Sequence, residues 1–311
     1  MKLVIAEKPS VGVALAKVIG ANQRRDGYFE GNGYIVSWCV GHLVRMANPD
    51  KYDEKYAKWK IEDLPIFPEE YLYELNPKTK KQFALLKKLM QDKKVDTVIN
   101  ACDAGREGES IFRLVYQQAK CKKPIQRLWI SSMEDQSIKE GFQNLKDGRD
   151  FENLFESAQT RSIADWLVGM NLSRLYSCLY KQNYSVGRVQ TPTLNMIVQR
   201  DGEIDRFIKE KYYTVEIIGD GITLSTERID DYEVADQLRN LIDEKIIITD
   251  VEKKEKVTRS DKLYDLTTLQ REANKVFGYS AKKTLDITQK LYDKKLVTYP
   301  RTDSRYLTED M

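Results

Sequence analysis

The sequence predicts an α/β domain with a mainly parallel sheet over residues 1–150, followed by helical, strand-rich and helix-turn-helix-like segments. Two observations support this prediction. Short apolar runs typical of strands alternate with helical patterns up to about residue 150, and helical periodicity dominates after it. The chain has 311 residues, a length that favours two or more domains over a single core.

The first strand and helix are expected within the first 21 residues. "KLVIA" (2–6) is a short apolar run typical of a buried strand. "SVGVALAKVIGA" (10–21) has apolar residues at helical spacing, with Ser10 as the expected N-cap. "GYFEGNGYIVSWCVGH" (27–42) has β-prone runs on both sides of a Gly-Asn-Gly turn, which is the pattern of a hairpin.

The alternation continues through the next hundred residues. "TKKQFALLKKLMQDK" (79–93) has the apolar spacing of an amphipathic helix. "VDTVINACDAGREGESIFRLVYQQA" (95–119) predicts a buried strand, a glycine-rich turn and a second helix.

The second half of the chain changes character three times. It is helical to about residue 206, with a break at "SVGRVQTPT", and then strand-prone in "KYYTVEII", "GITLSTERI" and "KIIITDVEK". Two helices split by Gly278-Tyr279-Ser280 and a short strand are expected after a charged link; they form a helix-turn-helix or simply two packed helices. We therefore predict four domains, at residues 1–150, 151–210, 211–258 and 259–311.

The composition is that of a globular protein and excludes several classes. Apolar residues make up 41% of the chain and charged residues 32%, with a net charge of +3, so any nucleic-acid surface must be local. There is no apolar run of about 18 residues, the length that a membrane span needs. The four cysteines lie far apart without a CxxC pair, so we expect neither a zinc site nor a disulfide framework, and a cytoplasmic location.

Three carboxylates follow two predicted strands. Glu7 comes directly after the first strand, and Asp103 and Glu107 come after the strand at residues 95–102. If these strands are neighbours in a parallel sheet, the carboxylates converge at one edge. Such a set of oxygen donors suits Mg²⁺. The alternative is a solvated acidic turn that favours the dipole of the following helix.

The segment "LVTYPRTDSRY" (296–306) places a tyrosine two residues before an arginine. In an extended segment Tyr299 and Arg301 share a face, so both can address one phosphate. A phenol with a pKa of about 10 is a weak nucleophile at neutral pH and needs a base or nearby positive charge. Alternatively, Tyr299 is one of 18 tyrosines with a packing role, and Arg301 pairs with Asp303 on the surface.

These motifs belong to an ordered set that resembles a known family. "VIAEKPS" with "DAGREGE" resembles the Toprim domain, the metal-binding fold of topoisomerases and primases. With "SAQTRSIADWLVGMNLSRLYS", "YSVGRVQTPTLNMIVQRDGEI" and "VTYPRTDSRYL", the set resembles the type IA DNA topoisomerases, closest to the bacterial topoisomerase III subfamily, over essentially the whole chain.

The resemblance implies roles for individual residues. Tyr299 would form a 5′-phosphotyrosyl bond with single-stranded DNA, Arg301 and Lys8 would lie at the phosphate, and Glu7 would act in proton transfer at the 3′ oxygen. The implied Mg²⁺ site consists of Glu7, Asp103 and Glu107. The positions that match the single-strand-binding residues are Arg161, Asp165, Arg188 and Gln190. Without the family, Arg161 and Asp165 are also simply an exposed i,i+4 pair.

The sequence departs from the family in three ways. Position 105 is Gly where many members have a second aspartate in Asp-x-Asp-x-Glu, so one carboxylate is missing. The family has a later histidine near the active site, whereas the single histidine here is His42, which we expect in the packed core. The family also continues for hundreds of residues beyond the tyrosine, so we expect a fragment that binds single strands and Mg²⁺ but relaxes supercoils poorly.

Two other functions remain open from the sequence. One is a non-catalytic fragment that binds single-stranded DNA. The other is a Toprim nuclease or primase that uses the metal without covalent attachment. Transfer of labelled DNA to Tyr299 separates the covalent reaction from both.

Overall fold

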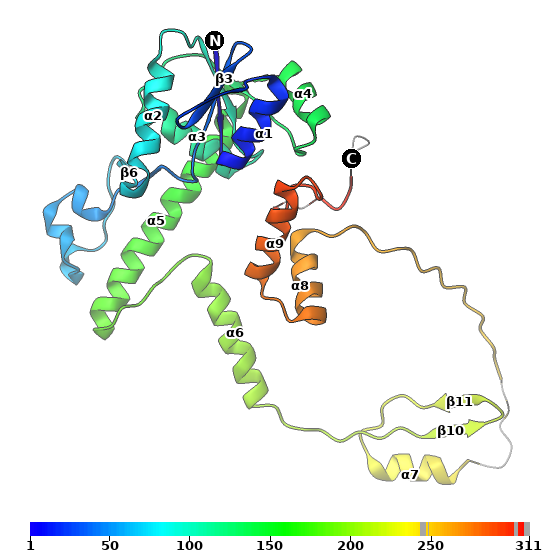
Figure 1. Cartoon of the computed structure of the whole chain (residues 1–311). Coiled ribbons are helices and arrows are strands. Elements are labelled where there is room, and N and C mark those ends of the chain that lie inside the picture. The colour runs from blue at the N-terminus through cyan, green and yellow to red at the C-terminus, as the bar shows by residue number, and fades with distance from the viewer. Residues whose placement is uncertain (243–246, 248, 302–303, 308–311) are drawn as a thin grey trace. The chain divides into compact units, whose positions relative to one another are not determined.

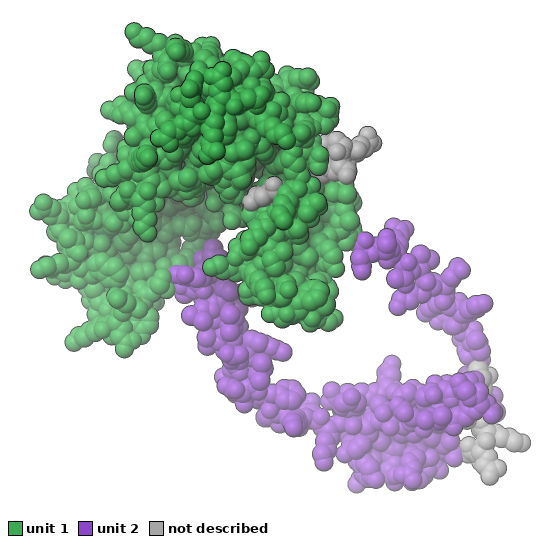
Figure 2. Space-filling view, viewed as in Figure 1, with its two compact units in different colours: residues 1–188, 262–311 green, residues 189–261 purple. Residues whose placement is uncertain are grey.

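The computed structural model describes residues 1–242, 247, 249–301 and 304–307 (Figure 1). They form two compact units, one of Met1–Arg188 with Lys262–Met311 and one of Val189–Asp261 (Figure 2). The finer division into four domains stays a prediction.

The first unit is built on a seven-stranded sheet in the order β2-β3-β4-β1-β7-β8-β9. Its four central strands run parallel, which confirms the predicted α/β class. The outer strands pair antiparallel at both edges. The strands are β1 (Lys2–Ala6), β2 (Gln23–Arg25), β3 (Tyr28–Gly31), β4 (Tyr34–Trp38), β7 (Thr97–Ala101), β8 (Ile125–Arg127) and β9 (Lys146–Asp147).

Helices cover both faces of this sheet. Leu3 and Ile5 of β1 belong to a core with α2 (Lys80–Gln91) and α3 (Arg106–Gln118). Val4 and Ala6 belong to a second core with α1 (Pro9–Ile19) and α4 (Asp135–Gln143). Because successive side chains of a strand point to opposite faces, a strand buried on both sides reads as a continuous apolar run.

Of two local predictions for the amino end, one is confirmed and one is wrong. The hairpin is confirmed, since β3 and β4 pair antiparallel around Asn32 and Gly33, both with positive φ. Ser10 as N-cap is wrong, because α1 begins at Pro9 and Lys8 occupies the capping position. Proline suits the first helical turn, where its missing N–H has no partner to lose.

The long helix α5 (Glu152–Tyr180) extends from the first unit's sheet region (Figure 1). The Trp166 indole nitrogen donates a hydrogen bond to the Ala47 carbonyl at 3.0 Å, which ties α5 to a small hairpin. That hairpin consists of β5 (Val44–Met46) and β6 (Tyr73–Leu75). Short 3-10 helices complete the region at Pro49–Lys51, Glu54–Ala57, Ile61–Asp63, Pro77–Thr79 and Gly148–Phe151.

The carboxyl end of the first unit contains the two predicted helices, α8 (Leu266–Phe277) and α9 (Ala281–Asp293). Gly278 ends α8 at φ 66°, and the Ser280 hydroxyl caps α9. Tyr292 is buried in the core formed with α1 and α4. The expected short strand is not formed over 294–301 or 304–307.

The second unit contains α6 (Gln190–Asp205), the hairpin of β10 (Glu216–Gly219) and β11 (Ile222–Ser225), and α7 (Tyr232–Asn240). The first two predicted strands of this region are therefore found. "KIIITDVEK" lies partly outside the described residues, and α7 was not predicted. Across the described residues of both units, no helix has the length and apolar character to cross a membrane.

Candidate active site

Glu7 and Asp103 emerge at one edge of the sheet. β1 and β7 are parallel neighbours with Ala6 opposite Ala101, so the prediction that these strands are adjacent is confirmed. The Asp103 backbone N–H donates to the Glu7 carboxylate at 3.4 Å. Glu7 is buried at 6% exposure, so the two carboxylates share a poorly hydrated space.

Lys8 is the cation between these two acids. Its Nζ lies 3.9 Å from a carboxylate oxygen of Glu7 and 3.9 Å from one of Asp103. Burial raises the pKa of Glu7, the negative charge of Asp103 raises it further, and Lys8 opposes both. Glu7 therefore keeps its proton to a higher pH than an exposed glutamate does.

Glu107 extends the acidic edge into solvent. Its carboxylate lies 3.1 Å from an Arg301 guanidinium nitrogen and 3.7 Å from His42 Nε2. The hydrogen bond with His42, and then the charge of Arg301, lower the pKa of Glu107. The expected core position of His42 is wrong, because half of its side chain is exposed; the alternative, a position near the DNA-binding face, agrees with its contact with Glu107. Its place shortly after β4, at the same sheet edge, was the available signal.

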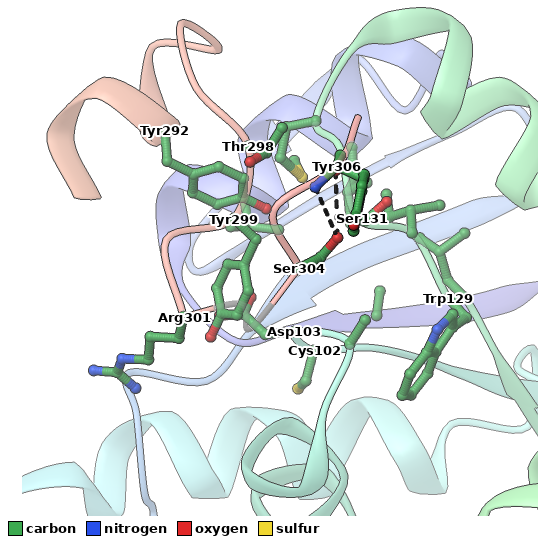
Figure 3. A pocket seen from close by; sticks show the side chains of 17 residues that line it. Cys102, Asp103, Trp129, Ser131, Tyr292, Thr298, Tyr299, Arg301, Ser304 and Tyr306 are labelled. Atoms are coloured by element: carbon green, nitrogen blue, oxygen red, sulfur yellow. Dashed lines mark hydrogen bonds between the residues drawn. The ribbon is translucent and has the colours of Figure 1, made fainter. Parts of the chain in front are cut away.

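Tyr299 reaches this edge from the other end of the chain. Figure 3 shows its ring between Tyr292 and Asp103, with Arg301 beside it. Burial raises the pKa of the Tyr299 phenol above its usual range, and the charges of Asp103 and Glu7 raise it further, while Arg301 opposes them. The phenol is therefore protonated at neutral pH.

A cavity of about 270 Å³ lies against the Tyr299 ring. Trp129, Ser131 and Met133 contribute to its wall, together with Asp103. Asp303, the alternative partner considered for Arg301, lies outside the described residues. Arg301 pairs with Glu107, so the arginine and the carboxylate turn are in contact.

A buried ionic network supports the turn that carries Asp103. Arg127 and Glu109 are both fully buried and lie 3.1 Å apart. Arg127 donates hydrogen bonds to the carbonyl oxygens of Cys102 and Asp103 at 2.7 and 2.8 Å. Asn100 donates to the same Glu109 carboxylate at 2.8 Å. The sequence pattern did not reveal this network, because charged residues are usually exposed.

Three of the four expected single-strand-binding residues lie together. Arg188 makes a two-point contact with Asp165, at 2.6 and 3.2 Å. Arg161 lies 3.9 Å from the same carboxylate. With Arg106, Arg161 and Arg188 line an open cleft of about 500 Å³ between the start of α3 and α5. Gln190 is the exposed first residue of α6, in the second unit.

The carboxylates are chemically suited to a hard cation. In the described ranges, no group of three or more His, Cys, Asp or Glu side chains forms a ready metal site. However, Glu7, Asp103 and Glu107 interact strongly enough that both neighbours raise the pKa of Glu7. They offer only oxygen donors, which a hard divalent cation prefers, and such a cation would share Glu7 and Asp103 with Lys8.

Comparison with known proteins identifies both halves of this arrangement. Residues 2–133 match the family model described as Toprim domain, and residues 149–311 match that described as DNA topoisomerase. The chain is 45% identical to DNA topoisomerase 3 of Bacillus subtilis and 47% identical to that of Bacillus licheniformis. In each case 99% of this chain and 44% of the relative are covered, so the chain spans less than half the relatives' length.

A solved structure shows the same fold. Full-length topoisomerase I from Thermotoga maritima matches with a TM-score of 0.70 and 25% sequence identity. The match covers 99% of this chain and 50% of that one. The similarity thus extends across the sheet, the long helix and the tyrosine segment.

Proposed function

The chain belongs to the type IA DNA topoisomerase family, and on that premise we propose that it cleaves and rejoins single-stranded DNA through Tyr299. The observation that carries the proposal is that Tyr299 and Asp103 line one cavity, close enough for the Asp103 charge to raise the pKa of the phenol. A nucleophile, three acids and two cations from segments almost 300 residues apart meet there.

The reaction is a transesterification that needs no ATP. The Tyr299 oxygen attacks a DNA phosphorus and passes its proton to a water molecule, and the bond from phosphorus to the 3′ oxygen breaks. The leaving 3′ oxygen takes up a proton, for which Glu7 is suited because its pKa is raised. The phosphotyrosine bond keeps the energy of the broken ester, so attack by the 3′-OH reverses the step.

Positive charge at the phosphate is assigned to Arg301 and Lys8. Arg301 can present two N–H groups to phosphate oxygens, and it is half exposed. Lys8 stands between Glu7 and Asp103 as a point charge. Both would stabilise the charge that develops on the phosphate and favour ionisation of the phenol.

Glu7, Asp103 and Glu107 are the residues that would hold Mg²⁺. When bound, the ion supplies positive charge beside the phosphate. Gly105 stands where the family pattern has a further aspartate, so the donor set is smaller here.

Single-stranded DNA is the proposed partner, bound next to this site. Arg161 and Arg188, with Arg106, offer cations in the cleft beside α5, and Asp165 holds Arg188 in place. Gln190 would add a polar contact. The chain spans 44% of its relatives' length. We therefore expect these 311 residues to bind and cleave single-stranded DNA but to relax supercoiled DNA poorly.

A comparison of affinity with cleavage tests the proposal. Glu7→Gln and Arg301→Ala should reduce Mg²⁺-dependent cleavage of single-stranded DNA about 100-fold or more, with little change in DNA affinity. Arg188→Ala should weaken binding instead. Equal losses of affinity and cleavage for Glu7→Gln would show that it is misassigned, and cleavage without covalent attachment would indicate a Toprim nuclease.

A further inference from the structure

We propose a second contact region for single-stranded DNA at the far end of α5, where three tyrosines stack on DNA bases. The tyrosine cluster consists of Tyr176, Tyr180 and Tyr184. The inference rests on the proposed function, because it extends the DNA path that starts at Tyr299. It adds a binding surface that takes no part in the chemistry.

The cluster is a contiguous aromatic surface in contact with solvent. The rings of Tyr176 and Tyr180 are parallel within 5°, with centroids 6.2 Å apart. Tyr184 packs edge-on against Tyr180 at 5.7 Å. The three residues are 43%, 61% and 44% exposed. Tyrosines buried for packing would not leave this much ring surface in water.

Hydrogen bonds hold the cluster in place. α5 ends where Lys181 adopts φ 54°, and the chain turns back along the helix (Figure 1). The Ser177 hydroxyl accepts from the Tyr184 backbone N–H at 2.9 Å, and the Ser173 hydroxyl accepts from Val186 in the same way. A platform that is already ordered loses little entropy when it binds a strand.

The cluster continues the surface that begins at the arginine cleft. From Arg161 onward, the exposed residues of α5 fall within an arc of about 100° on the helix. These residues are Arg161, Asp165, Leu172, Tyr176, Leu179 and Tyr180. At 1.5 Å per residue, the distance from Arg161 to Tyr180 is about 28 Å. That length holds about eight nucleotides at a stacked spacing of about 3.4 Å.

The two ends of this surface differ in chemistry, which favours a nucleic acid. Arg161 and Arg188 face the cleft, where phosphates would bind, while the far end offers aromatic faces and the exposed Lys181. Every base has a π-face, so stacking on tyrosine binds a strand without sequence preference. Cations followed by aromatic rings are the combination found in single-strand-binding grooves.

Length-dependent binding tests the inference. The double variant with Tyr176→Ala and Tyr180→Ala is tested for its affinity for fluorescein-labelled oligo-dT, which anisotropy measures. The strands have about 5 and about 15 nucleotides. We expect about 5- to 100-fold weaker binding of the long strand and no change for the short one. Phe at both positions keeps the rings and should restore affinity. Tyr232→Ala, which removes an exposed helical tyrosine paired with Tyr213, is the matched control and should bind normally.

Salt dependence separates stacking from charge. The tyrosine variant should keep the wild-type slope of log affinity against log salt, whereas Arg161→Ala should reduce it by about 1. If the tyrosine variant binds both strands like the wild type, the tyrosine cluster does not contact the DNA and the inference is wrong. If the wild type binds neither strand, the proposed function itself fails.

Discussion

The backbone of Asp103 lies directly against Gly108 in the first turn of α3. A Cβ at Gly108 would stand 2.2 Å from the Asp103 carbonyl oxygen and 2.9 Å from its nitrogen. A Cβ atom does not approach backbone atoms this closely, so any side chain at Gly108 must displace the Asp103 turn. At Gly105 a Cβ would meet nothing within 4 Å, and the backbone is extended at φ 175°.

The first prediction compares these two glycines. Gly108→Ala should lower Mg²⁺-dependent cleavage about 10- to 100-fold, because a displacement of about 1 Å in a catalytic group costs that much. It should also destabilise the chain by about 1–3 kcal/mol, which urea unfolding measures. Gly105→Ala is the control and should leave both quantities nearly unchanged. Equal behaviour of the two variants would contradict the assigned role of the Asp103 turn.

The second prediction adds a carboxylate at the open position. A Cβ at position 105 meets nothing within 4 Å, and Gly105→Asp completes the family's acidic pattern. If Asp103 and Glu107 bind Mg²⁺, the added charge should strengthen binding several-fold, as measured by calorimetry or by the Mg²⁺ dependence of cleavage. Unchanged or weaker Mg²⁺ affinity would mean that the ion binds elsewhere.

The third prediction concerns the stability of Glu7→Gln in EDTA. Burial and Asp103 raise the pKa of Glu7 above its ordinary value of 4.5, so the folded chain binds this proton more tightly than the unfolded chain. The stabilising contribution of Glu7 is full below pH 4.5 and is lost as the pH rises through the raised value. At pH 7 the variant should therefore unfold at higher urea than the wild type.

Its pH profile provides the check. The difference in unfolding free energy between Glu7→Gln and the wild type should shrink as the pH falls toward 4.5, because wild-type Glu7 becomes protonated. Saturating Mg²⁺ should remove this difference by stabilising the ionised form in the wild type. If Glu7→Gln is less stable than the wild type at pH 7 without metal, the ionised Glu7 carboxylate is not destabilised by burial and Asp103.

The fourth prediction addresses the buried pair of Arg127 and Glu109. Arg127→Met leaves Glu109 with fewer partners and should cost about 3–5 kcal/mol in unfolding free energy. The double variant with Glu109→Gln should cost less than the sum of the single variants by about 0.5–3 kcal/mol. Additive costs would mean that the two residues do not stabilise the Asp103 turn together.

The sequence was sufficient for the parts of the fold that follow periodicity. β1 and β7 were visible as apolar runs, and a glycine-rich turn marked where β7 passes into α3. The position of Glu7 and Asp103 then follows from the geometry of a parallel sheet. The link from these acids to Tyr299 came from the family resemblance, since periodicity carries no information across almost 300 residues.

Other features depend on tertiary contacts that no local pattern encodes. The buried positions of Arg127 and Glu109 depend on one another, and each residue alone has the appearance of a surface residue. His42 faces Glu107 because of where the chain leaves β4, and composition favoured a core position instead. The helix α7 lies in a strand-prone region, where its Asp231 N-cap was the overlooked signal.

The most direct test of the central claim is covalent transfer of label from DNA to Tyr299. Single-stranded DNA labelled at its 3′ end is incubated with the chain and Mg²⁺. The mixture is then denatured with detergent, without alkali, and its components are separated by electrophoresis. We predict label on the protein with the wild type and with Tyr292→Phe, the neighbouring control, and none with Tyr299→Phe. Label that persists in Tyr299→Phe, or its absence from the wild type, would contradict the account.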